Sequence, residues 1–94
     1  MFLIIIDIDF KKELVLDFKR WFSESNHILS KFEGLISRKL MGSVHDEQYR
    51  IIVEHQSRET FEKMYRSEEY KTLQSEASSS FMVRPLKPSV YNLV

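Results

Sequence analysis

The segment Phe2-Leu3-Ile4-Ile5-Ile6 is apolar at every position and rich in β-branched side chains. A strand with one face in water alternates apolar and polar residues, so this pattern predicts a strand that is covered on both faces. With 94 residues the chain has the length of one domain, and we expect a single domain over residues 1–94. A domain this small has few apolar residues left to cover a second sheet face. A second copy of the chain would supply that cover.

Apolar residues recur with a 3.6-residue period over residues 10–32, which predicts one long amphipathic helix. Asp9 stands where its side chain could cap the start of this helix. Gly34 follows at the place where a left-handed conformation costs least, and residues 35–41 have the composition of a strand. We therefore expect a helix that ends at Gly34 and leads directly into a second strand.

The second half of the chain adds a hairpin, a helix and a last strand. Residues 42–48 are polar and residues 49–55 are rich in β-branched side chains, which predicts a hairpin with a short loop. Ser57 is placed to cap a second helix, and Ser67 is placed to restart that helix after a bend. Two prolines bar any further helix, so residues 89–94 predict a final strand on the edge of the sheet.

The predicted order is β-α-β-β-α-β, which is that of the ferredoxin-like α+β fold. Its two crossovers place both helices on one face of a four-stranded antiparallel sheet. The other face has no cover from the chain itself, although the first strand is apolar there too. The pattern therefore predicts a homodimer that forms through the open sheet face.

Charge and composition argue against several classes of function. Lys and Arg number 14, as do Asp and Glu, so there is no excess charge to attract nucleic acid, and we expect no nucleic-acid partner. Asp7 and Asp9 interrupt the first apolar run far short of a bilayer span, so no membrane partner is expected either. A cytoplasmic location is the default expectation.

The sequence contains few residues suited to metal binding or to nucleophilic catalysis. The chain has no cysteine, which removes a thiol nucleophile and any thiolate metal ligand. Its three histidines, His27, His45 and His55, are expected on a helix, a loop and a strand. We predict no metal site, and the segment His45-Asp46-Glu47 is expected to be a solvated turn.

Two segments resemble the antibiotic biosynthesis monooxygenase family. One is the helix end Phe32-Glu33-Gly34-Leu35-Ile36, where the family commonly has a glycine turn into its second strand. The other runs without a gap from Val53 to Lys71 and is similar to the family's strand, serine-capped helix and bend. The resemblance covers nearly the whole chain and implies a dimeric α/β barrel. It also implies activity as a quinol-type monooxygenase or as a haem-degrading oxygenase.

The residues that haem-degrading members use are all substituted. Those members have an Asn on the first strand, a Trp and a haem-ligating His on the second helix, and the matching positions here are Asp7, Met64 and Gln74. Glutamine is a poor axial ligand for iron, so haem degradation by this route is not expected. We predict no cofactor.

His55 is the candidate catalytic residue, at a position where the family very often has Trp. Histidine titrates near neutral pH, so His55 could take a proton from a phenol or hydroquinone and make an anion that reacts with O2. The alternative is a hydrogen-bonded histidine that fills the space of a tryptophan.

The resemblance implies a substrate pocket between the helices and the sheet. Trp21, Tyr65 and Tyr70 are the candidate lining residues, with ordinary core packing as the alternative. Asp7 is a further candidate, because a carboxylate on an apolar strand is costly unless it is paired or lies at the wet end of the strand. The pair Arg38-Lys39 is expected at the solvated surface.

The leading hypothesis is a homodimeric, cofactor-independent monooxygenase of this family's type that oxidises a small aromatic or quinol-like molecule. The alternative is a non-catalytic dimer of the same fold that binds a small ligand or is purely structural. Pocket volume separates the two hypotheses. A cavity of roughly a few hundred cubic ångströms that reaches His55 favours an enzyme or binder, whereas a filled interior favours a scaffold.

Overall fold

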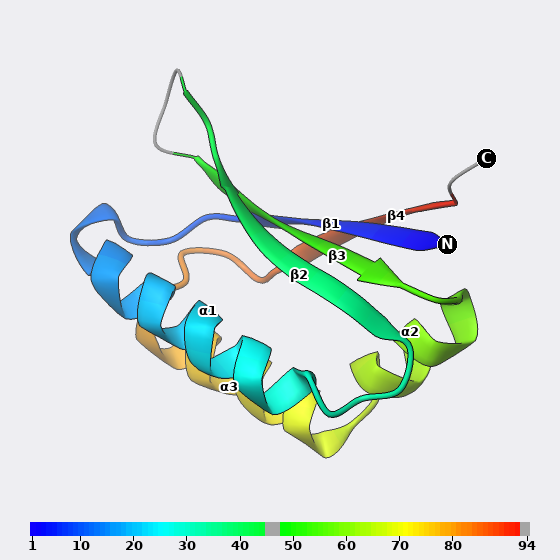
Figure 1. Cartoon of the computed structure of the whole chain (residues 1–94). Helices are drawn as coiled ribbons and strands as arrows, with labels where there is room; N and C mark the ends of the chain where they lie inside the picture. Colours follow the sequence, from blue (N-terminus) through cyan, green and yellow to red (C-terminus); the bar gives the residue numbers. More distant parts are fainter. Residues whose placement is uncertain (45–47, 93–94) are drawn as a thin grey trace.

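The computed structural model describes residues 1–44 and 48–92 (Figure 1), so His45, Asp46 and Glu47 of the predicted loop lie outside the described residues. The elements in chain order are β1 (Phe2–Ile8), the 3-10 helix η1 (Lys12–Leu14), α1 (Val15–Leu29), β2 (Leu35–Gly42), β3 (Tyr49–His55), α2 (Arg58–Tyr65), α3 (Glu68–Ser80) and β4 (Lys87–Asn92).

The four strands form one antiparallel sheet in the order β2-β3-β1-β4. Figure 1 shows the helices on one side of this sheet, with α1 and α3 lying next to each other. The predicted α+β ferredoxin-like class is therefore confirmed, as is the position of β4 at an edge. In the register, Ile4 of β1 stands between Val53 of β3 and Val90 of β4.

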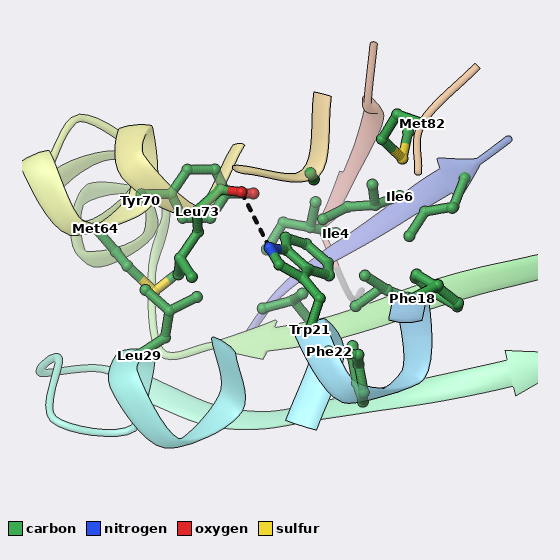
Figure 2. Close-up of a cluster of buried hydrophobic side chains, with 14 of the residues drawn as sticks. Ile4, Ile6, Phe18, Trp21, Phe22, Leu29, Met64, Tyr70, Leu73 and Met82 are labelled. Carbon is green, nitrogen blue, oxygen red and sulfur yellow. Dashed lines mark hydrogen bonds between the residues drawn. The ribbon is translucent and has the colours of Figure 1, made fainter. Parts of the chain in front are cut away.

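The core lies between the sheet and the helices. Alternate residues of β1, from Phe2 to Ile8, are buried on the helix side, and Ile4 is completely enclosed. Phe18 of α1 is also fully buried, and its ring packs against the rings of Trp21 and Phe81. Figure 2 shows these side chains gathered between the layers. The apolar stripes of the helices thus bury one face of the sheet.

The first helix is shorter than the sequence predicts. A 3-10 turn precedes α1, and the N-cap of α1 is Leu14, with no side-chain cap. The prediction that Asp9 caps this helix is wrong: the Asp9 carboxylate lies 3.3 Å from Arg84 Nε, and the Asp9 carbonyl accepts a bond from Val83. The chain at residues 9–11 is therefore tied to the segment before β4 rather than wound into the helix.

Gly34 marks the turn into β2, as predicted, but α1 ends at Leu29 rather than at Gly34, and a turn connects the two. Its φ is +88°, in the left-handed region that side chains disfavour. A Cβ at this position would overlap the side chain of Thr60 in α2. The Gly34 carbonyl accepts a hydrogen bond from Gln56 at 2.8 Å. The turn is thus packed directly against the start of α2.

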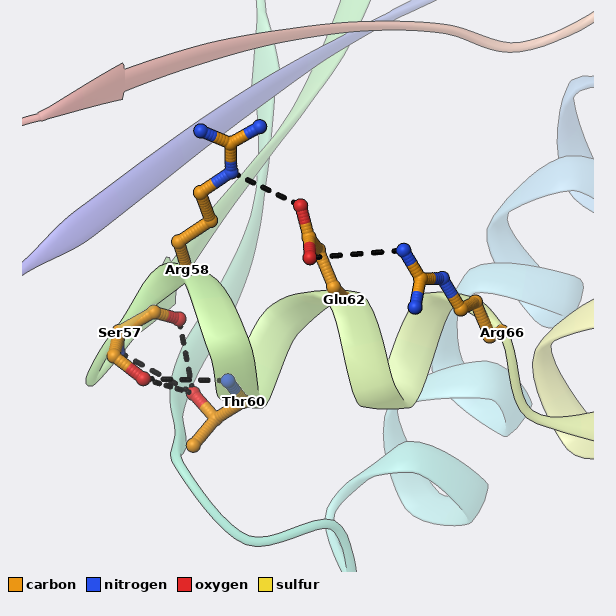
Figure 3. A network of polar contacts seen from close by, with 5 residues as sticks. All are labelled: Ser57, Arg58, Thr60, Glu62 and Arg66. Atoms are coloured by element: carbon orange, nitrogen blue, oxygen red, sulfur yellow. Dashed lines mark hydrogen bonds and ion pairs between the residues drawn. The ribbon is translucent and has the colours of Figure 1, made fainter.

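The second helix is divided into α2 and α3, and serines cap both parts. Ser57 Oγ accepts a hydrogen bond from the Thr60 amide at 3.2 Å, and Thr60 Oγ1 accepts one from the Ser57 amide at 3.3 Å, which completes a capping box (Figure 3). Ser67 Oγ accepts a bond from the Tyr70 amide at the start of α3. Both predicted caps are confirmed. Glu62 of α2 lies between Arg58 and Arg66, an exposed arrangement of small energetic weight.

The sheet face away from the helices has an apolar centre and a polar margin. Residues directly opposite on paired strands share a face, so Ile5 lies beside Ile52, and Leu3 occupies the same face two residues away. Around them, Asp7 pairs with Arg50 at 2.8 Å, and Ser37 donates a hydrogen bond to Glu54 at 3.1 Å. None of the described helices is both long and apolar enough to span a bilayer.

Candidate functional site

A small void lies between the helix layer and the sheet. Its volume is about 10 Å³, which is room for about one water molecule. Residues from the sheet, from α1 and α3, and from the segment before β4 form its wall, and they are Ile6, Trp21, Ser25, Arg38, Ile51, Tyr70, Leu73, Gln74 and Leu86. Two of the predicted pocket residues, Trp21 and Tyr70, therefore meet at one place.

Arg38 brings a positive charge into this wall. Its Nη1 donates hydrogen bonds of 2.8 Å to Ser25 Oγ and 2.8 Å to Asn26 Oδ1, and its guanidinium lies 5.2 Å from the centre of the Phe22 ring. The enclosed Nε of Arg38 has no hydrogen-bond partner. Burial lowers the pKa of Arg38 to about 10, with the neighbouring Tyr70 acting in the opposite direction, so the group stays charged at neutral pH.

The register of β2 explains why Arg38 points inward. Arg38 pairs with Val53, whose side chain is buried under the helices, whereas Lys39 pairs with Ile52 on the open face. The expectation that Arg38 and Lys39 share a solvated surface is therefore wrong for Arg38. Adjacent residues of a strand point to opposite faces, so only one of two neighbouring cations can be on the outer side.

Trp21 and Tyr70 give the wall its aromatic and polar character. Trp21 Nε1 donates a hydrogen bond of 3.0 Å to the Leu73 carbonyl, which fixes the indole plane (Figure 2). Tyr70 is 5% exposed, and burial raises its pKa to about 12, while the charge of Arg38 opposes that shift. The phenol is therefore neutral at physiological pH and is able to donate a hydrogen bond.

His55 is completely buried at the end of β3, and it is not in the wall of the void. Its Nδ1 lies 3.0 Å from Thr60 Oγ1, its Nε2 lies 3.5 Å from Met64 Sδ, and its ring packs edge-on against Phe61 at 5.7 Å. These contacts are those of the core histidine that was the alternative interpretation. The catalytic role of His55 stays a prediction.

The hydrogen bonds of Thr60 assign the protons of the imidazole. Thr60 Oγ1 donates to the Ser57 carbonyl at 3.0 Å, so it accepts from His55, and Nδ1 carries the proton. Nε2 is then the basic nitrogen, and it faces Met64. A proton acceptor must lie within hydrogen-bond reach of the group that it deprotonates, and Met64 Sδ holds that position here.

The burial of His55 predicts a loss of stability in acid. Burial lowers the pKa of His55 below its ordinary value of 6.5, so the folded chain binds fewer protons than the unfolded chain below that pH. The neutral imidazole therefore contributes stability above pH 6.5 that is lost as the pH falls toward the folded-state pKa. We expect the urea-unfolding free energy of the parent to fall more steeply than that of His55→Gln between pH 7 and pH 5, by up to about 1.4 kcal/mol per pH unit.

The matched control is His27→Gln, because His27 is an exposed histidine on α1. This variant should keep the acid dependence of the parent. Equal slopes for the parent and His55→Gln would contradict the assignment of the acid sensitivity to His55.

Tyr65 and Asp7 lie apart from the void. The ring of Tyr65 is 5.0 Å from that of Tyr70 and 5.6 Å from that of Phe61, but Tyr65 is not part of the wall. Asp7 is paired with Arg50 on the open face, where both border an open depression of about 700 Å³ at the far end of the sheet. The structure thus brings Trp21 and Tyr70 together and leaves Tyr65, Asp7 and His55 outside the site.

Ser25 and Arg38 belong to the site, and sequence reasoning missed both. Ser25 stands on the same helical stripe as Phe18, Phe22 and Leu29, and it is fully buried. The sequence did contain a signal for this: a serine on the buried stripe of a helix needs a polar partner. Ser25 Oγ donates to the Phe22 carbonyl at 2.7 Å and accepts from Arg38.

Metal ligands do not gather in the part of the chain that the structure describes. No group of three or more His, Cys, Asp or Glu side chains lies close enough there to hold an ion. Among the described residues, Arg38 is the one charged side chain in the wall of the void, and it repels cations and attracts anions.

Sequence comparisons give no relative: no protein-family model matches the chain and no curated protein matches it significantly. Solved structures do match. A Nitrosomonas europaea protein with a provisional description as an antibiotic biosynthesis monooxygenase superposes with a TM-score of 0.85 at 16% identity, over 100% of this chain and 99% of that one. A conserved protein from Methanosarcina mazei Go1 gives 0.88 at 16% identity, over 99% and 92%.

A third match is SnoaB from Streptomyces nogalater, described as a cofactor-independent oxygenase. Its TM-score is 0.85 at 7% identity, over 99% of this chain and 92% of that one. At such identities the likeness establishes the fold. The chain therefore has the fold of the antibiotic biosynthesis monooxygenases, as the resemblance in its sequence implies.

Proposed function

We propose that the chain is a small cofactor-independent monooxygenase of the antibiotic biosynthesis monooxygenase type, acting on an aromatic or quinol-like small molecule. The observation that carries the proposal is the void between helices and sheet, where Trp21 and Tyr70 stand beside the half-buried cation of Arg38. An aromatic wall suits a ring, and a cation attracts an electron-rich or anionic ligand. The fold shared with SnoaB, described as a cofactor-independent oxygenase, supports the same reaction class.

The reaction proceeds without an outside reductant. A hydroquinone and O2 give a hydroxyquinone and water: one oxygen atom enters a ring C–H bond, the two hydroxyls become carbonyls, and the other oxygen atom leaves as water. The substrate supplies all the electrons. Removing its phenolic proton starts the reaction, because the phenolate gives up an electron to O2 more readily than the phenol does.

His55 remains our candidate for the base that removes this proton. For this role Nε2 has to reach the substrate, so the thioether of Met64 must move away from it. Methionine side chains are unbranched and adaptable, but Met64 is enclosed in the core, so this rearrangement also requires neighbouring core side chains to shift. The half-buried Leu86 and Gln74 have to move in the same way to admit a ring into the void.

Oxygen consumption with a panel of hydroquinones and polyphenols tests the activity. We expect the parent to consume O2 and to place one atom from labelled O2 in the product. His55→Ala should lower kcat by ~100-fold or more, the usual contribution of a general base. His27→Ala, which changes an exposed histidine, should leave kcat unchanged.

Two results contradict these assignments. No turnover by the parent with any member of the panel removes the monooxygenase function. Equal turnover by the parent and His55→Ala removes His55 as the base and leaves the function in place.

The second candidate is a non-catalytic dimer that binds a small ligand or is purely structural. The volume test set from the sequence favours this candidate: the void between helices and sheet holds only about 10 Å³, it does not reach His55, and His55 is enclosed in the core. Saturable binding of an aromatic probe without O2 consumption identifies a ligand-binding protein, and the lack of both identifies a structural one.

We also propose that the working form is a homodimer that joins through the open sheet face. Leu3, Ile5 and Ile52 form its apolar centre. The polar residues around them include two pairs, Asp7 with Arg50 and Ser37 with Glu54, and the exposed Lys39 beside Ile52. This arrangement has the apolar core and polar rim of a protein interface.

A further inference from the structure

The charge of Arg38 has no counter-charge in the described parts of the chain. Within residues 1–44 and 48–92, the ion pairs involve other groups, and no carboxylate reaches the Arg38 guanidinium. Arg38 is half-buried, and its neutral hydrogen-bond partners and the Phe22 ring replace only part of the water that would solvate a free guanidinium. An anionic ligand that completes the pair would offset the remaining cost.

The described carboxylates on the surrounding elements pair with other groups or are exposed, and none of them pairs with Arg38. On the sheet, Glu54 accepts a hydrogen bond from Ser37 and Asp7 pairs with Arg50, both on the open face. On α3, Glu68 pairs with Lys71 and Glu69 pairs with Lys31. On α1, Asp17 and Glu24 are exposed. The helix–sheet layer around Arg38 thus contains one positive charge and neutral groups.

The neutral partners of Arg38 orient the guanidinium and leave part of it available. Ser25 and Asn26 take the two hydrogen atoms of Nη1 at 2.8 Å and 2.8 Å, while the enclosed Nε has no acceptor. A guanidinium presents its N–H groups as a planar fork that matches the two oxygen atoms of a carboxylate. Arg38 is therefore held in place and lacks the acceptor that its geometry suits.

The wall of the void sets the charge of that acceptor. Arg38 is its single charged residue, so one negative charge completes the balance, whereas a phosphate dianion would need further cations. Trp21 and Tyr70 stand in the same wall and suit an aromatic ring. Leu86, on the irregular segment before β4, is half-buried and is the apolar side chain that a ring would displace.

We propose that Arg38 binds a carboxylate group of the ligand, so that the site selects aromatic carboxylates over neutral rings of the same shape. This inference rests on the proposed function only in placing the ligand in the void between helices and sheet. The preference of the site for carboxylates is thus assigned to Arg38, which neither accepts a proton nor transfers an electron in the reaction. Arg38 is thus a binding residue.

Trp21 provides a direct readout, because it is the only tryptophan of the chain and lines the same void. Its indole N–H gives one cross-peak in a 1H–15N spectrum of the labelled protein. We titrate the protein with 2,5-dihydroxybenzoate and with 2,5-dihydroxybenzamide, which has the same ring and a neutral side group. The carboxylate should shift the indole peak and bind roughly tenfold tighter or more than the amide.

Arg38→Met keeps the length of the side chain and removes its charge, and it should bind the two probes equally. Arg20→Met is the matched control, because Arg20 is exposed on α1, and it should keep the preference of the parent. If Arg38→Met does not fold, Arg38→Gln replaces it, and the preference of the parent alone still tests the proposal. Equal affinities in the parent, or an undiminished preference in the Arg38 variant, would overturn the assignment.

The same two probes separate this inference from the proposed function. Preferential binding of the carboxylate without O2 consumption supports the assignment of Arg38 and contradicts the monooxygenase. Oxidation of both probes with equal KM supports the monooxygenase and contradicts the assignment of Arg38.

Discussion

Gly34→Ala is expected to lower the free energy of unfolding far more than the same change at Gly42. At a φ of +88° a Cβ is strained, at a cost of about 1–2 kcal/mol. The added methyl would also overlap the side chain of Thr60, and overpacking of this kind costs about 1–3 kcal/mol more. A domain of this size has a total stability of only about 5–10 kcal/mol, so the variant should be close to unfolding at 37 °C.

A shift of Thr60 in the Gly34→Ala variant would also disturb two hydrogen-bonded contacts that Thr60 makes. It completes the capping box with Ser57, and its hydroxyl accepts the Nδ1 proton of His55. A shift of Thr60 therefore weakens the start of α2 and leaves a buried imidazole without its partner. Urea unfolding followed by circular dichroism measures the loss.

The other glycine provides the matched control. Gly42 does not have a positive φ, and a Cβ there would lie 3.4 Å from Tyr49 Cε1, which is an ordinary contact. Gly42→Ala should therefore change stability by less than about 1 kcal/mol. Should the two variants lose the same stability, the special role of the Gly34 turn is refuted.

Ile5→Asp is expected to convert the proposed dimer into a monomer. Ile5 lies in the apolar centre of the open face, directly beside Ile52 of β3. In a symmetric dimer each copy would bury an unpaired carboxylate, at a cost of about 3 kcal/mol or more in association. The dissociation constant should rise by ~100-fold or more. Light scattering at micromolar concentration should give twice the 11.3 kDa chain mass for the parent and the single chain mass for the variant.

Leu16→Asp is the control for this variant. Leu16 is 73% exposed on α1, on the helix layer rather than on the open face, so its replacement should leave the dimer intact. The fold of Ile5→Asp should also persist, because Ile5 is outside the buried core cluster. A parent that scatters as a single chain, or an Ile5→Asp variant that stays dimeric, rules out this interface.

The strands, caps and turn were predictable because each depends on local chemistry. The left-handed turn at Gly34 and the serine caps at Ser57 and Ser67 follow from backbone geometry and from the hydrogen-bonding capacity of the side chains. The start of α1 was not predictable in this way. Asp9 has a distant partner, Arg84, and a contact between residues 75 positions apart leaves no local pattern.

The site was predicted in part. Trp21 and Tyr70 share one void, as an aromatic pocket between helices and sheet requires. Arg38 was not predicted as a site residue, because two adjacent cations, Arg38 and Lys39, are typical of a solvent-exposed surface. Only the pairing of β2 with β3 shows that Arg38 is the one that points inward. The volume of a void depends on how side chains fill the space between elements, and periodicity in the sequence carries no information about that.

The two edge strands of the sheet, β2 and β4, determine whether further copies of the chain can add side by side. Among the described residues, β4 has a paired strand on one side only, and it contains Pro88, which has no N–H to offer to a strand approaching from outside. At the opposite edge, the irregularity between Leu35 and Ser37 interrupts the even spacing of β2. Lateral growth into a fibre is therefore disfavoured at both edges. In the proposed dimer each copy covers the open face of the other and leaves no second open face for a third copy.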